Sequence, residues 1–197
     1  MQKPRNYDNT SSYGEFTPLE LGGHVCKIIK VEETTSSTDK PMIKIALDIA
    51  EGNQKDYYRM MFDRDDRPDK KWGCVVYQLI EDRDGNTSKG FKTFIESVKK
   101  SNKGFNEDAI WNDNFASYFK GKLIGGVFGR EQYKASDGKF KWSTKCVQFR
   151  SVDVVREGVE VPEDKYHKDY KNIDVTCDIR QHKDFEEIVD DDEDLPF

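Results

Sequence analysis

Two groups of cationic and aromatic side chains in this 197-residue chain are candidates for binding a ligand. The first group lies within residues 57–72 and comprises Tyr57, Tyr58, Arg59, Arg67, Lys70, Lys71 and Trp72. The second lies within residues 130–145 and comprises Arg130, Lys139, Lys141, Trp142 and Lys145. Cations neutralise phosphates, and each base stacked on an aromatic ring contributes about 1–3 kcal/mol. Together they are typical of a surface that binds a single nucleic-acid strand without reading its sequence.

Some of these aromatic rings have an alternative place in a folded core, where large apolar side chains are most often found. One of Tyr57 and Tyr58 could fill the core, and so could Phe140 beside the second group. Trp142 is equally compatible with the core and with the surface. Trp72 lies in a run of basic residues, so for this side chain we favour stacking on bases.

Four aspartates interrupt the first group and raise the alternative of a nuclease, because paired carboxylates hold Mg²⁺. They are Asp63, Asp65, Asp66 and Asp69. All four are clustered in one loop, and the sequence contains no motif of a hydrolase or of a nucleotide-binding enzyme. The histidines and cysteines also lack the spacing of metal ligands. We therefore predict that the protein is not an enzyme and uses neither a metal nor another cofactor.

The sequence ends in a run of acids followed by a short apolar tip. Its residues are Asp190, Asp191, Asp192, Glu193, Asp194, Leu195, Pro196 and Phe197. Pro196 fixes its own φ and favours an extended Leu195, so Phe197 is presented on a stiff arm. Its carboxylate offers a second contact to an Arg or Lys of a partner. We interpret this segment as a protein-docking peptide; the alternative is a plain solvated acidic tail.

This tip resembles the C-terminal peptide of bacterial single-stranded-DNA-binding proteins, in which acids precede a proline–phenylalanine pair. The resemblance implies that host replication, recombination and repair enzymes dock on the tip. The body, roughly Gly22–Pro162, also resembles single-stranded-DNA-binding proteins from phages and mobile elements of Gram-positive bacteria. The segments that carry this second resemblance are Lys40-Pro41-Met42, Ala50-Glu51-Gly52, Arg67-Pro68-Asp69-Lys70-Lys71-Trp72 and Phe119-Lys120-Gly121-Lys122-Leu123.

The elements that would position these residues follow from hydrophobic periodicity. Alternation over 42–49 predicts a strand with its isoleucines and leucine facing inward, and a second strand is expected from Gly22 onward. We also predict strands over 56–62, 122–133 and 139–155, while 75–80 could be a strand or a helix. The last strand would carry Lys139, Lys141 and Lys145 on one face. A glycine-containing turn over 135–138 joins the last two strands into a hairpin.

One segment has helical instead of strand periodicity. The spacing of Phe91, Phe94, Ile95 and Val98 predicts an amphipathic helix, with Thr87 or Ser88 as N-cap and Gly104 as the stop. The order of three strands, a helix and two strands predicts a mainly β protein with the OB-fold. That fold is a five-stranded Greek-key barrel with a helix between strands 3 and 4. We divide the chain into an arm (1–21), the OB-fold domain (22–157), a linker (158–183) and a disordered acidic tail (184–197).

The charge is distributed unevenly along the chain. The whole chain carries −6, but residues 184–197 hold eight acids and no bases, so the remaining residues carry +2. A body that is neutral to slightly basic is compatible with DNA binding. No signal peptide and no apolar run of about 20 residues is present, so we expect no membrane association and a location in the bacterial host cytoplasm.

The expected function is sequence-independent binding and protection of single-stranded DNA during replication, recombination and repair, with recruitment of host enzymes through the tip. Two other functions stay open. An adaptor or decoy would bind the same enzymes through the tip without binding DNA. A recombination mediator would anneal complementary strands. The sequence does not fix the oligomeric state, and a homo-oligomer is left open.

Overall fold

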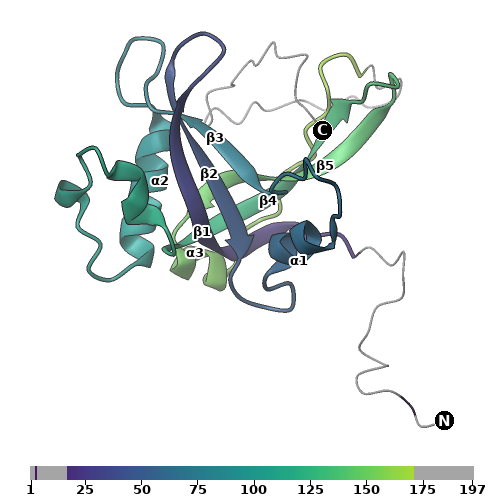
Figure 1. Ribbon diagram of the computed structural model, residues 1–197, viewed down its shortest axis with the longest axis horizontal. Coiled ribbons are helices and arrows are strands. Elements are labelled where there is room, and N and C mark those ends of the chain that lie inside the picture. The colour runs from purple at the N-terminus through teal and green to yellow at the C-terminus, as the bar shows by residue number, and fades with distance from the viewer. Residues whose placement is uncertain (1–2, 4–16, 171–197) are drawn as a thin grey trace.

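The computed structural model describes residue 3 and residues 17–170, and these contain five strands in one antiparallel open sheet. The strands are β1 (Gly22–Thr35), β2 (Pro41–Ile49), β3 (Val75–Leu79), β4 (Leu123–Lys134) and β5 (Phe140–Arg150). Their order across the sheet is β3-β2-β1-β4-β5. The prediction of a mainly β protein is therefore confirmed. Figure 1 shows that the sheet is strongly twisted and that its longest hairpin, β4–β5, projects from one end.

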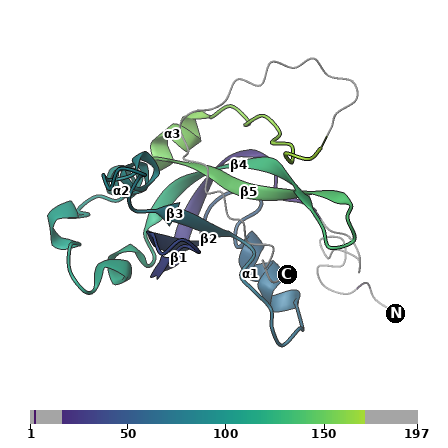
Figure 2. The same ribbon diagram turned by 90° about the horizontal axis from the view of Figure 1, so that it is seen from above.

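Three α-helices and two short 3-10 turns surround the sheet. They are α1 (Tyr57–Arg64), α2 (Lys89–Ser101), η2 (Glu107–Ala109), η3 (Phe115–Phe119) and α3 (Val152–Glu157). The predicted position of a helix between the third and fourth strands is confirmed by α2. Figures 1 and 2 place α2 at the end of the sheet that lies away from the tip of the β4–β5 hairpin.

Strand β2 follows the alternation that predicts it. Ile43, Ile45, Leu47 and Ile49 are all 0% exposed and form the centre of the core. Because β2 lies between β1 and β3, its inward side chains contact neighbours from both sides. Burying such a side chain completely stabilises the fold by about 1.5–3 kcal/mol, so this face fixes the register of the strand.

Helix α2 is also confirmed, including one of the two proposed caps. The hydroxyl of Ser88 accepts the backbone N–H of Phe91 at 3.2 Å. Phe94 and Val98 on the inner face are 0% exposed. The helix ends at Ser101, earlier than the predicted stop, because the Asn102 amide donates to Val98 O (2.7 Å) and Leu123 O (2.8 Å). This bond to the start of β4 ties the helix end to the sheet.

The predicted third strand over 56–62 is wrong, because these residues form α1. The Asp48 carboxylate at the end of β2 accepts the backbone N–H of Tyr58 at 3.0 Å and is buried there. Asp56 adopts a left-handed φ of 58°, which turns the chain into the helix. The third strand is the segment that periodicity left undecided, Val75–Leu79, which pairs with β2. A run this short has no decisive period, so its contacts with the rest of the chain select the conformation.

The predicted strand over 139–155 is too long, because β5 ends at Arg150 and α3 follows. Val152 and Val155 of α3 pack on Val25 in a small cluster apart from the main core. The helix approaches so closely that a Cβ at Gly125 would lie 2.5 Å from a methyl group of Val155. A glycine is therefore required at Gly125 for this packing.

The chain after α3 returns along β4. Strand β4 pairs with β1 only as far as Phe128, so its outer part has a free edge. The backbone N–H of Lys165 donates to Arg130 O (2.9 Å), and that of Gln132 donates to Lys165 O (2.8 Å). Residues within the expected linker thus lie against the hairpin. The predicted acidic tail lies outside the described residues.

Candidate nucleic-acid interface

The outer half of the β4–β5 hairpin brings together two residues of the second predicted group. The guanidinium of Arg130 on β4 lies 5.3 Å from the ring centroid of Trp142 on β5. Residue Gln132 is the cross-strand partner of Trp142, so Arg130 occupies the adjacent position on the same face of the hairpin. Trp142 is 38% exposed, which leaves part of its ring available to a ligand.

Aromatic side chains from the returning segment continue this surface. The ring of Tyr166 meets Trp142 edge to face at 5.1 Å, and Tyr170 stacks on Tyr166 at 5.5 Å with an interplanar angle of 18°. Phe140 closes the row, because its ring lies 5.4 Å from Tyr170 and 5.3 Å from His167. We call Trp142, Tyr166, Tyr170, Phe140 and His167 the hairpin aromatic row.

Most cations of the second group are already paired with carboxylates. Arg130 donates two hydrogen bonds to Asp164, one of them Nε to Oδ1 at 2.9 Å. These bonds raise the pKa of the Arg130 guanidinium above its ordinary value. Lys141 pairs with Asp137 at 3.5 Å. A phosphate that binds these side chains would therefore have to compete with protein carboxylates.

Glu131 joins the hairpin to the returning segment through a second set of ion pairs. Its carboxylate accepts from Lys145 at 2.8 Å and from Lys165 at 3.2 Å. Burial raises the pKa of Glu131, but the hydrogen bond from Lys145 and the two positive charges outweigh burial, so the pKa is lowered overall. Lys139, the remaining predicted cation of the hairpin, is exposed and forms no ion pair with a residue in the described part of the chain.

The first predicted group lies on α1 and the loop after it. Arg59 is exposed on α1. Arg67 forms a two-fold contact with Asp65, at 2.9 Å and 2.7 Å, which lowers the pKa of that carboxyl to about 2. The Lys70 ammonium donates to the backbone oxygen of Phe62 at 3.0 Å. Lys71 is exposed in the same loop.

The assignment of Tyr58 to a DNA surface is wrong, because this side chain is only 5% exposed. Its ring lies 6.4 Å from Phe128 and nearly parallel to it in the main core. Burial raises the pKa of its hydroxyl. Tyr57 is half-buried and packs edge to face on Tyr58 at 5.1 Å. Tyr58 therefore lies in the core and Tyr57 at its edge, which agrees with the alternative that one tyrosine of this pair fills the core.

The Trp72 side chain is fixed by a hydrogen bond and by packing, rather than fully exposed for stacking on bases. Its indole N–H donates to Leu47 O at 2.7 Å, and its ring packs against the main core. Phe62 lies beside it with 5.6 Å between ring centroids. The side chain is half-buried, so only one part of its ring faces outward.

The two groups lie toward the same end of the molecule. Tyr58 of α1 contacts Phe128, which precedes Arg130 by two residues and shares its strand face. Figures 1 and 2 both place α1 on the hairpin side of the sheet, away from α2. The folding of the chain thus brings toward one end of the molecule two groups that are about 70 residues apart in sequence.

Sequence reasoning missed three exposed tyrosines that lie on the returning segment or on the sheet. Tyr166 and Tyr170 belong to the hairpin aromatic row, and the signal for them was the dense aromatic and basic composition of 165–170 in a supposed linker. Tyr77 on β3 is 41% exposed and lies opposite Lys44 of β2. The register of β2 with β3 was needed to find that pair.

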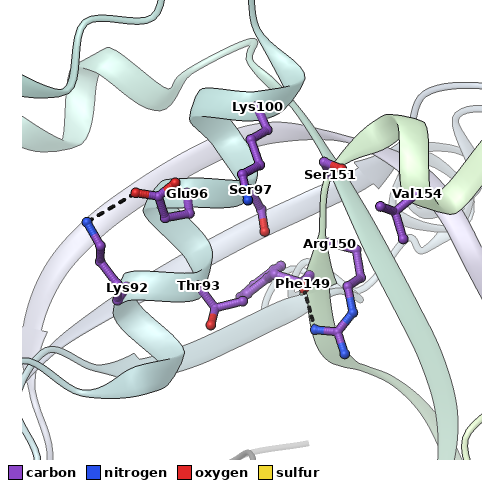
Figure 3. Close-up of a pocket in the computed structure, with 9 residues that line it drawn as sticks. All are labelled: Lys92, Thr93, Glu96, Ser97, Lys100, Phe149, Arg150, Ser151 and Val154. Carbon is purple, nitrogen blue, oxygen red and sulfur yellow. Dashed lines mark hydrogen bonds and ion pairs between the residues drawn. The ribbon is translucent and has the colours of Figure 1, made fainter.

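An open cleft of about 300 Å³ lies at the other end, between α2, the end of β5 and α3. Figure 3 shows Lys100 and Arg150 on opposite walls, with Phe149 between them. Lys92 at its edge is paired with Glu96 at 3.2 Å. No residue of either predicted group lines this cleft, so it is not part of the candidate interface.

No protein-family model matches the chain, and no curated protein matches its sequence. Within residues 17–170 no three His, Cys, Asp or Glu side chains are grouped so that they could hold a metal ion. In the same described part, no helix is long and apolar enough to cross a membrane.

Proposed function

We propose that the protein binds single-stranded DNA without sequence preference and without catalysing a reaction on it. The observation that carries the proposal is the exposed Trp142 ring beside the Arg130 guanidinium on a projecting hairpin. A ring with a free face stacks on any base, and a guanidinium next to it contacts the phosphate of the same nucleotide.

The topology of the sheet supports an OB-type barrel as the scaffold. Its helix lies between the third and fourth strands, and its strand order matches an OB barrel that is open between β3 and β5. OB-folds bind oligonucleotides with the face of strands 2 and 3 and with the loops that join strands 1–2 and 4–5. Trp142 lies next to the 4–5 loop, and the Lys44–Tyr77 pair lies on strands 2 and 3.

The ion pairs determine how this binding should respond to salt. Arg130, Lys141 and Arg67 each face a carboxylate in the unbound protein. When DNA binds, a phosphate must displace that carboxylate instead of a free counterion. Each such phosphate contact therefore adds less affinity than a contact with an unpaired cation would. We therefore expect stacking to supply a large share of the affinity.

The biological setting of the proposal rests on the sequence. Residues Asp190–Phe197 would recruit host replication, recombination and repair enzymes, and the body would protect phage or mobile-element single strands in the host cytoplasm. The resemblance of the tip and body to single-stranded-DNA-binding proteins supports this setting.

The test measures binding of the full chain to a labelled dT oligonucleotide by fluorescence anisotropy, at several salt concentrations. The logarithm of the binding constant should fall linearly with the logarithm of salt, by about 0.7 per phosphate neutralised. A duplex of equal length should bind more weakly. Tighter binding to the duplex would overturn the proposal, and capture of host enzymes without any DNA binding would favour the adaptor. Rapid annealing of complementary strands would favour the recombination mediator.

A further inference from the structure

We propose that the segment from Pro162 to Tyr170, which follows the last helix, forms half of the base-stacking surface. Tyr166 and Tyr170 would stack on bases together with Trp142 of the hairpin. This inference rests on the proposed binding of single-stranded DNA and assigns a ligand contact to a part of the chain outside the five-stranded sheet.

The segment is attached to the hairpin by its backbone. Lys165 exchanges two backbone hydrogen bonds with the free edge of β4, at 2.9 Å and 2.8 Å. The Gln132 side chain is 6% exposed, and its oxygen accepts the backbone N–H of His167 at 3.3 Å. A Cβ at Gly129 would lie 3.2 Å from Pro162, so β4 and the returning segment are in close contact there. The segment thus pairs with β4 at Lys165 through an isolated parallel bridge.

Ion pairs hold the segment on both faces of the hairpin. Asp164 bonds the Arg130 guanidinium on the face that carries Trp142. The next residue, Lys165, pairs with Glu131 at 3.2 Å on the opposite face. Successive side chains of an extended chain point to opposite faces, so both contacts follow from one backbone conformation. That conformation directs Tyr166 back to the face of Trp142.

The ring geometry leaves aromatic faces for a ligand. Tyr166 is 49% exposed and Tyr170 is 37% exposed, although each ring already contacts another ring. Because Tyr166 and Tyr170 lie nearly parallel to each other at 5.5 Å, the gap between them is too narrow for a base. A base would therefore stack on an outward face of the row, where the rings form a platform.

The surrounding charge favours a nucleic acid as the occupant. Lys139 is exposed in the hairpin loop next to Phe140 and has no ion-pair partner among the described residues. Arg130 lies beside the Trp142 end of the row. A cation beside an aromatic platform matches a strand whose phosphates flank its bases.

The experiment uses the full chain with tyrosines 166 and 170 both changed to alanine, and a dT oligonucleotide about 16 nucleotides long, the upper site size of one OB-fold. Tyr118→Ala is the matched control, because Tyr118 is also 37% exposed but lies on η3, near α2. We expect the double variant to lose about 5- to 150-fold in affinity, and the control to bind as the wild type does. Changing the same two tyrosines to phenylalanine should retain the affinity, because the rings remain.

A second measurement does not depend on how a variant folds. The unmodified protein is cross-linked by light to a bromodeoxyuridine oligonucleotide, and the cross-linked peptides are identified by mass spectrometry. Cross-links within 162–170 are expected. If the wild type binds dT but the double variant binds equally well and no cross-link falls in this segment, the inference fails while the proposed function stands. If the wild type does not bind dT at all, both fail together.

Discussion

The guanidinium of Arg130 lies over the ring of Trp142, 5.3 Å from its centroid, and also donates hydrogen bonds to the carboxylate of Asp164. A cation fixed over an indole by a carboxylate is preorganised, so it loses little conformational freedom when it meets a phosphate. The same carboxylate competes with that phosphate. Asp164 therefore has two effects on the candidate site: it orients Arg130, and it competes with a phosphate for the guanidinium. Substitution of Asp164 tests which effect is larger.

Trp142→Ala should weaken binding to dT by about 1–3 kcal/mol, because a stacking face is removed. Trp111→Ala is the control, since Trp111 is 56% exposed but stacks on Phe115 of η3, near α2. The control should change the affinity by less than about 0.5 kcal/mol. DNA should quench tryptophan fluorescence in the wild type and less in Trp142→Ala. Equal losses in both variants would remove Trp142 from the site.

Asp164→Asn should tighten DNA binding, because Arg130 no longer shares its charge with a carboxylate, while the backbone hydrogen bonds of Lys165 still hold the segment on β4. We expect a gain of about 1 kcal/mol at low salt that shrinks as salt rises. Asp153→Asn is the control, because it changes the net charge equally but lies on α3 beside Arg156. Binding is measured by anisotropy over a salt series. A gain of the same size in the control would indicate a general charge effect.

Gly23→Ala should destabilise the fold by about 1–3 kcal/mol through overpacking. The new Cβ would lie 2.6 Å from a methyl group of Val159 and 3.0 Å from one of Val155. Because the nearest obstacle is the Val159 side chain, a second change, Val159→Ala, should restore part of the loss. Urea unfolding of the two single variants and the double variant measures the coupling. Purely additive losses would contradict this packing of the chain after α3.

The contacts of Glu131 should make stability depend on pH. Its pKa is lowered in the folded protein, so its contribution is complete above the unfolded pKa of about 4.3 and is lost as pH falls through the folded pKa. Glu131→Gln should therefore cost about 1 kcal/mol at neutral pH. The difference from wild type should vanish in acid. Thermal unfolding from neutral to acid pH measures it, and a difference that grew in acid would contradict the assignment.

Phe197→Ala should abolish capture of host replication and repair enzymes but leave DNA affinity unchanged, because the acids remain. Deleting Asp190–Phe197 should also abolish capture, and it should tighten DNA binding at low salt, because a polyanion that competes for the cations is removed. Pull-down from a bacterial host lysate and anisotropy measure the two effects. Unchanged capture by Phe197→Ala would leave the tail as a plain acidic solubiliser.

Local sequence patterns were sufficient to predict the elements that bury one face with a clear period. Alternation placed Ile43 to Ile49 of β2, and a period of 3.6 with the Ser88 cap placed α2. The turn before β5 was also predictable from its glycine. In the structure Gly138 adopts a φ of 78°, a conformation that favours glycine. Each of these signals is local, since it depends on residues that are neighbours in the sequence.

Long-range packing determines which of the cationic and aromatic residues reach the surface together. Tyr57 and Tyr58 are adjacent and identical in type, but the contact with Phe128 from another strand buries Tyr58. Residues 162–170 were expected to belong to a linker, yet their pairing with the edge of β4 fixes them beside Trp142. Burial and pairing of this kind depend on partners that are 20 to 70 residues away in the sequence, and local periodicity carries no information about such partners.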